Sequence, residues 1–154
     1  MIAANLVLRL PRDATSVALT RRVLGAALAS IGVTEDCRAD VQLALSEACT
    51  NVIQHAAPSQ NYQVQVSFDQ KQCTIEVTDD GPGIDDLGPL DPATPVPLPS
   101  PLDESGRGLR IIALVADEVE VRRRRPSGTL LRFVKRLSWV QDQRPSDSAK
   151  PRPK

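Results

Sequence analysis

Three short polar clusters contain the residue types that can do chemistry, and the first is S-E-A-C-T-N-V-I-Q-H. Its Glu47, Asn51 and His55 recur at every fourth residue, so on a helix they line one side. A carboxamide oxygen can ligate Mg²⁺, and a carboxylate one turn away can accept a proton. Taken alone, the spacing also fits a solvated helix flank with a half-buried histidine.

The second cluster is V-T-D-D-G-P-G-I, which directly follows a segment with the alternation of a buried strand. Asp79 is then held at the strand end, where its carboxylate can accept a hydrogen bond from an exocyclic amine. Gly81 and Gly83 allow the backbone to adopt positive φ and to approach a flat ring closely. The alternative is a plain tight turn, since D-G and P-G are strong turn signals.

The third cluster is E-S-G-R-G-L-R-I-I, in which Gly106 and Gly108 precede an amphipathic helix expected from about Gly108 to Ala116. Such a turn points free backbone N–H groups at whatever lies before the helix, which suits phosphate. Arg107 adds a positive charge. Ser105 as an ordinary N-cap is the equally simple alternative.

Two common nucleotide motifs are excluded by their context. No Gly-Lys-Ser/Thr follows the glycines, so the cluster is not a P-loop, and it follows a proline-rich loop rather than a strand, so it is not a Rossmann fingerprint. The four lysines lie away from the three clusters, so Mg²⁺ and arginine would have to balance phosphate charge. The basic run 122–125 lies near a predicted hairpin tip and indicates a solvated hairpin or partner-binding edge rather than a nucleic-acid site.

Composition limits the class of protein. The 154 residues suit one domain, and 41% apolar with only 3% aromatic residues predicts an aliphatic core. Nineteen basic and nineteen acidic residues cancel, which gives no overall attraction to nucleic acid or to an anionic membrane. Three irregularly spaced cysteines argue against a disulfide framework and a zinc site. With no apparent signal peptide or membrane span, we expect a cytoplasmic protein.

The elements that must position these clusters begin with a short strand at residues 5–10. Asp13 or Thr15 can cap a helix running to about Ser30, which Gly32 ends. Thr34 is the expected N-cap of a second helix that extends to about His55.

Two hairpins and a loop complete the predicted order. Alternation predicts strands at 62–68 and 73–77, and a second hairpin from Val119 through the turn 126–128 to Leu137. Between them, residues 84–105 break every pattern. Residues 142–154 are polar and proline-rich, and we expect a disordered tail. The prediction is a two-layer α+β sandwich, with a mostly antiparallel sheet covered by three helices.

Together and in this order, the clusters resemble the nucleotide-binding boxes of the GHKL (histidine-kinase-like) ATPase superfamily. Glu47, Asn51 and His55 resemble E-x-x-x-N-x-x-x-H, and Asp79, Gly81 and Gly83 resemble D-x-G-x-G. Gly106 and Gly108 are similar to the second glycine box of the superfamily, and Gly128-Thr129 is similar to its G-T before the last strand. The resemblance covers about residues 5–137 and implies a Bergerat-type ATP-binding fold.

The resemblance also implies roles for individual residues. Glu47 would be the general base, and Asn51 would ligate Mg²⁺. Asp79 would accept from the adenine amine, with Gly81 and Gly83 beside it and Thr129 helping through a water. The β- and γ-phosphates would be held by Gly106, Arg107 and Gly108. A single domain at 1–141 would carry residues 84–105 as the ATP lid.

Within the superfamily, the short chain resembles bacterial anti-sigma factor serine/threonine-protein kinases. This implies an ATP- and Mg²⁺-dependent kinase that phosphorylates a serine of an anti-anti-sigma (STAS) partner, that can sequester a sigma factor, and that forms a homodimer. The rival hypotheses are a nucleotide-dependent binding switch without kinase activity and a structural module whose clusters are only turns and caps.

Overall fold

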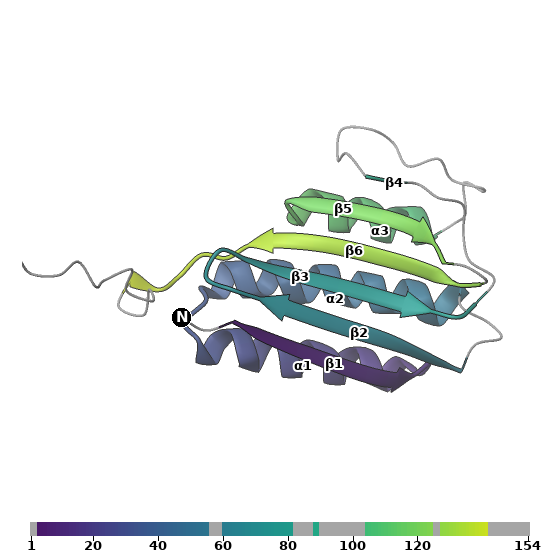
Figure 1. Cartoon of the computed structure of the whole chain (residues 1–154), viewed down its shortest axis with the longest axis horizontal. Coiled ribbons are helices and arrows are strands. Elements are labelled where there is room, and N and C mark those ends of the chain that lie inside the picture. The colour runs from purple at the N-terminus through teal and green to yellow at the C-terminus, as the bar shows by residue number, and fades with distance from the viewer. Residues whose placement is uncertain (1–2, 56–59, 82–87, 90–103, 125–126, 142–154) are drawn as a thin grey trace, which may run out of the picture.

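A computed structural model of the chain describes residues 3–55, 60–81, 88–89, 104–124 and 127–141. Its elements form two layers, a sheet and three helices that cover one face of it (Figure 1). This arrangement confirms the predicted α+β sandwich.

Six strands form one sheet in the order β1-β2-β3-β6-β5-β4, and every neighbouring pair is antiparallel. The last hairpin therefore returns to pair with β3, which places β6 beside the strand that ends at the second cluster. The strands are β1 (Ala4–Pro11), β2 (Asn61–Phe68), β3 (Gln72–Asp79), β4 (Gly88–Pro89), β5 (Glu118–Arg123) and β6 (Thr129–Arg136).

The helices are α1 (Ala14–Ser30), α2 (Glu35–His55) and α3 (Glu104–Val115). Asp13 caps α1 by accepting from the backbone N–H of Thr15, as expected. The hydroxyl of Thr34 accepts from the N–H of Cys37 at 3.4 Å, which confirms it at the start of α2. Gly32 follows α1 with a φ of 92°, the left-handed conformation that ends many helices.

The core lies between the two layers and is aliphatic, as the composition predicted. Alternate residues of β2 and β3 face the helices, and one stripe of each helix faces the sheet. The largest side chains that are almost completely buried include Leu24, Leu28, Leu45, Val64, Ile75, Ile112, Val121 and Phe133.

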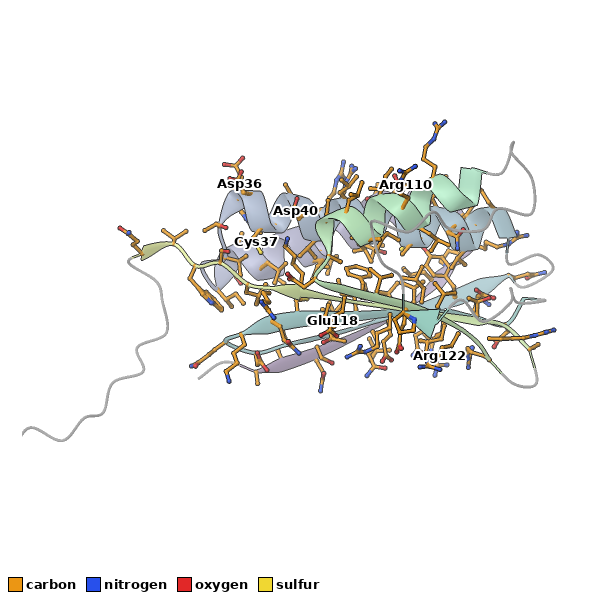
Figure 2. All side chains as sticks on the ribbon, turned by 90° about the horizontal axis from the view of Figure 1, so that it is seen from above. Asp36, Cys37, Asp40, Arg110, Glu118 and Arg122 are labelled. Atoms are coloured by element: carbon orange, nitrogen blue, oxygen red, sulfur yellow. The ribbon has the colours of Figure 1, made fainter. Side chains whose placement is uncertain are left out.

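The other face of the sheet carries polar and charged side chains. On this face Arg132 Nε lies 3.8 Å from Glu76 Oε1, and Arg132 Nη1 lies 3.9 Å from Glu118 Oε2. Figure 2 shows the labelled Arg122 on the side of the sheet away from the helices, while Arg110 projects from α3 on the opposite side. No helix in the described ranges has both the length and the apolar character that a bilayer span requires.

Two expectations about residues 84–105 are wrong. Gly88 and Pro89 form the short strand β4, which pairs with Glu120 and Val121, so the segment is not loop throughout. α3 begins at Glu104 rather than near Gly108, so Ser105 lies inside the helix and is not its N-cap. A glycine weakens a helix only by about 1 kcal/mol, and α3 packs against α2.

Candidate functional site

α2 brings the first cluster to its flank that faces α3. Glu47 and Asn51 are both partly buried and lie one helical turn apart, as the spacing predicted. The carbonyl oxygen Oδ1 of Asn51 is buried and has no hydrogen-bond partner in the described part of the chain. A buried acceptor without a donor is costly, and it matches the oxygen ligand that a hard cation such as Mg²⁺ requires.

Glu47 lies directly against the backbone of α3. A Cβ atom placed on Gly108 would come within 3.0 Å of Glu47 Oε2, so the absence of a side chain makes room for this carboxylate. Glu47 forms no hydrogen bond or ion pair with another described residue. The contact joins the first and third clusters and leaves a carboxylate free to accept a proton.

The third cluster forms the first turns of α3 and not a turn before it. An α-helix leaves its first four N–H groups without intrahelical partners. Because α3 begins at Glu104, the N–H groups of Gly106 and Arg107 belong to that set, whereas Gly108 lies one residue beyond it. Arg107 is exposed and Gly108 is buried. The arrangement retains donors suited to phosphate, although their position differs from the prediction.

Asp79 is the last residue of β3, and it is buried with 6% of its surface exposed. Its Oδ1 accepts from the N–H of Gly81 at 2.8 Å, and the backbone N–H of Thr129 also donates to the carboxylate. Burial raises the pKa of the Asp79 carboxyl, although these two donors and the charge of Arg124 oppose the shift. A buried carboxylate held in one orientation is suited to accept from a ligand amine.

The strand β6 starts beside Asp79. Thr129 pairs directly with Asp79 across β3 and β6 and is buried at 8% exposure. Gly128 precedes it with a φ of 104°, and a Cβ atom there would overlap the carbonyl oxygen of Asp79. Only glycine allows the two backbones to approach so closely.

The three clusters lie at one end of the molecule. In Figure 1, β3 and α2 both end at the right, where α3 begins. Gly81 is buried just after β3. Gly83, most of the predicted lid at 84–105 and the predicted tail at 142–154 lie outside the described residues, as does the side chain of His55.

One residue of this end was missed in the sequence. Arg124, expected on a solvated hairpin or partner-binding edge, donates to the backbone carbonyl of Asp79 at 2.9 Å and to Asp80 Oδ1 at 3.1 Å. No local pattern relates residues 45 positions apart, so only the pairing of β3 with β6 and β5 reveals this contact.

Cysteine chemistry is excluded at the helix flank. Cys49 lies between Glu47 and Asn51 in sequence, but it faces the core with none of its surface exposed. Burial raises the pKa of its thiol to about 12, so the thiol stays protonated at neutral pH. All three cysteines, Cys37, Cys49 and Cys73, are free and buried.

Replacing Asp79 by Asn should change how stability depends on pH. The folded-state pKa of Asp79 lies above its unfolded value, so the folded state binds more protons between the two. The contribution of Asp79 to the stability of the nucleotide-free wild type should therefore fall as pH rises from about 4 through the folded pKa, and Asp79→Asn should remove that contribution.

Thermal melts of both forms from pH 4 to 8 give the check, with Asp36→Asn as the control because this carboxylate is exposed in the first turn of α2, away from the turn that ends β3. The stability gained by Asp79→Asn over wild type should grow as pH increases. A gain that is the same at every pH would contradict a penalty from the buried carboxylate.

Comparison with known proteins identifies the family of this chain. The family model described as "Histidine kinase-like ATPase domain" matches residues 10–135. The serine-protein kinase RsbW of Bacillus velezensis is 34% identical over 123 residues, which cover 74% of this chain and 75% of that protein. RsbW of Bacillus subtilis is 32% identical over 140 residues, covering 85% of this chain and 84% of that protein.

A solved structure supports the same fold. The crystal structure of the RsbU and RsbW domains of a Mycobacterium tuberculosis protein matches with a TM-score of 0.66 over 89% of this chain, at 19% identity. This chain spans 33% of the length of that protein. The chain belongs to the histidine kinase-like ATPase domain family, with RsbW serine-protein kinases among its relatives.

Proposed function

We propose that this protein is an ATP-dependent serine-protein kinase that phosphorylates a serine of an anti-anti-sigma (STAS) partner and can sequester a sigma factor. Membership of an ATPase domain family implies the use of ATP. The observation that carries the kinase proposal is the carboxylate of Glu47, which has no partner among the described residues. It lies beside Gly108 and one turn from the Asn51 oxygen, which also has no described donor.

Each part of the nucleotide has a proposed place. The adenine amine donates to Asp79, with Gly81, Gly83 and Thr129 around the ring. The N–H groups of Gly106 and Arg107, together with Gly108 and the Arg107 side chain, hold the β- and γ-phosphates. The burial of Asp79 and the N–H of Gly81 that donates to its carboxylate support the first placement. The N–H groups in the first turn of α3, which have no partner within the helix, support the second.

Asn51 is the proposed Mg²⁺ ligand, because its buried Oδ1 lacks any described donor. The cation, when bound, neutralises charge on the phosphates. Glu47 then orients the serine hydroxyl and accepts its proton as the serine oxygen bonds to the γ-phosphorus. ADP leaves with the electrons of the bond between the γ-phosphorus and the bridging oxygen. Phosphoryl transfer depends mostly on positioning and on charge stabilisation, and the packing of α2 on α3 supplies that positioning.

The remaining proposals concern the domain boundaries, the cellular location and the oligomeric state. We propose a domain at 1–141 with residues 84–105 as its ATP lid, and a cytoplasmic location without direct contact to nucleic acid or membrane. A homodimer is also proposed, and β1 at the sheet edge is one place for it because its outer side is unpaired within the described sheet.

Incubation with labelled ATP, Mg²⁺ and STAS-domain proteins from the same genome tests the proposal. We expect label on a serine of one partner. In parallel, ATP with Mg²⁺ at 100 times Kd should stabilise the protein by about 2.7 kcal/mol in thermal melts.

The pair of measurements separates the rival functions. Nucleotide stabilisation without phosphoserine on any partner would indicate a binding switch. No stabilisation at millimolar nucleotide would contradict ATP binding altogether and would favour a structural module.

A further inference from the structure

Arg124 lies just after β5 and holds the turn that ends β3. Its Nη1 donates to the carbonyl oxygen of Asp79 at 2.9 Å and to Asp80 Oδ1 at 3.1 Å, so one guanidinium group bridges the backbone of one residue and the side chain of the next. The N–H of Arg124 also donates to the carbonyl of Gly128 at 2.9 Å. Arg124 is therefore anchored to β6 by its backbone while its side chain reaches β3.

The guanidinium group of Arg124 reaches this turn from the face of the sheet that does not pack against the helices. Arg124 lines a hollow of about 570 Å³ with Arg9, Gln63, Thr78 and Asp80. Arg9, Gln63 and Thr78 alternate with the core-facing residues of their strands, so the hollow opens on the sheet face away from the helices.

The carboxylate of Asp79 lies on the other side of the same turn, because it is buried and belongs to the core-facing set of β3. Arg124 consequently touches the backbone of Asp79 without facing the space where its carboxylate would meet a ligand. Ser127, which donates to the carbonyl of Asp80 at 3.3 Å, gives the turn a second tie to the same hairpin.

The ion pair of Arg124 with Asp80 is too exposed to add much to the free energy of unfolding. The side chains of Arg124 and Asp80 are 40% and 76% exposed, and surface pairs of this kind add little to folding. A guanidinium that donates simultaneously to a carbonyl and to a carboxylate does, however, restrict geometry, since its donors lie in a rigid plane.

We propose that Arg124 is a positioning residue for adenine recognition, which holds the end of β3 so that Asp79 meets the exocyclic amine of the base. The inference rests on the proposed role of Asp79. Hydrogen bonds depend steeply on angle and distance, and a strand end that can rotate would misalign the carboxylate while leaving the phosphate site on α3 intact.

The test compares two nucleotides that differ only at the amine. Dissociation constants with Mg²⁺ are measured for ATP and for purine riboside triphosphate, which lacks the 6-amino group. The variants are Arg124→Ala, Arg124→Lys and Asp79→Ala. Arg122→Ala is the matched control, because Arg122 belongs to the same hairpin and pairs with Glu120 at 3.2 Å rather than with the turn.

Wild type should prefer ATP, and Arg124→Ala should weaken ATP binding by about tenfold, as expected for one strong hydrogen bond to a charged group. Binding of purine riboside triphosphate should change less than about twofold, since the bond to the amine is absent there. Arg124→Lys should fall between, because an ammonium can donate to both acceptors but, on its flexible stem, does not hold them in one rigid plane. Arg122→Ala should match wild type with both nucleotides.

Four results would overturn the inference. Equal weakening of both nucleotides by Arg124→Ala would indicate a general structural role, and unchanged binding of both would indicate none. If Arg124→Ala does not fold, Arg124→Lys is used in its place. A preference for ATP equal to that of wild type in Arg124→Lys would then show that Arg124 does not position Asp79. Asp79→Ala shows whether the role of Asp79 or that of Arg124 is wrong. If this variant still prefers ATP, Asp79 does not bind the adenine amine, and the inference about Arg124 is wrong as well.

Discussion

Glu47→Gln is expected to lower the rate of phosphate transfer to the serine partner by about 10²- to 10⁴-fold, the usual contribution of a general base. Glutamine has nearly the same shape as glutamate, so it fits beside Gly108. The carboxylate lies so close to this residue that a Cβ atom on Gly108 would be 3.0 Å from Glu47 Oε2. It cannot accept the hydroxyl proton. The dissociation constant for ATP should stay within about threefold of wild type, because the proposed base acts on the acceptor hydroxyl and not on nucleotide binding.

Single-turnover assays with labelled ATP and the STAS partner measure this effect, and equilibrium binding measures nucleotide affinity separately. Glu35→Gln is the matched control, since Glu35 lies exposed in the first turn of the same helix, far from Gly108. Transfer by Glu47→Gln at a rate close to wild type would show that Glu47 is not the base. Loss of ATP binding in the same variant would place its role in binding instead.

Gly128→Ala is expected to cost about 3 kcal/mol or more of unfolding free energy. An alanine at a φ of 104° adopts a backbone conformation that side chains disfavour. Its Cβ would also overlap the carbonyl oxygen of Asp79, and that obstacle is backbone and cannot rotate away. Because the displaced strand end carries the proposed adenine ligand, ATP affinity should fall together with stability.

Gly32→Ala is the control that separates these two causes. Gly32 also has a positive φ, 92°, but it follows α1 and does not precede β6. Its replacement should cost the backbone strain, about 1–2 kcal/mol. Urea unfolding of both variants, with the m-value compared against wild type, measures the difference. Equal costs at the two positions would mean that Gly128 and Asp79 are not in close contact.

Local patterns predicted most of the elements. Asp13 and Thr34 lie where a side-chain oxygen before a helix satisfies free N–H groups. Val64, Ile75 and Val121 are buried in alternation with polar neighbours, as a one-sided sheet requires. Local patterns failed in the proline-rich segment, because β4 is held by cross-strand bonds to β5 and α3 begins four residues earlier than its apolar spacing indicated.

In the candidate site, too, some relations between residues follow from local sequence and others do not. The spacing of Glu47 and Asn51 determines that they share one side of a helix, and the D-D-G run after an alternating strand determines that Asp79 lies at a strand end. These relations extend over a few residues, where the covalent geometry of helix and strand leaves few choices.

Only the tertiary structure decided which of these residues meet. The contact of Glu47 with Gly108 joins positions on two helices, and the contacts of Arg124 and Gly128 with Asp79 depend on β6 lying between β3 and β5. Such contacts depend on how whole layers pack, and many packings are compatible with the same local pattern. The sequence therefore determined the chemical groups available, and the packing of α2 on α3 and of β3 on β6 determined their arrangement as one site.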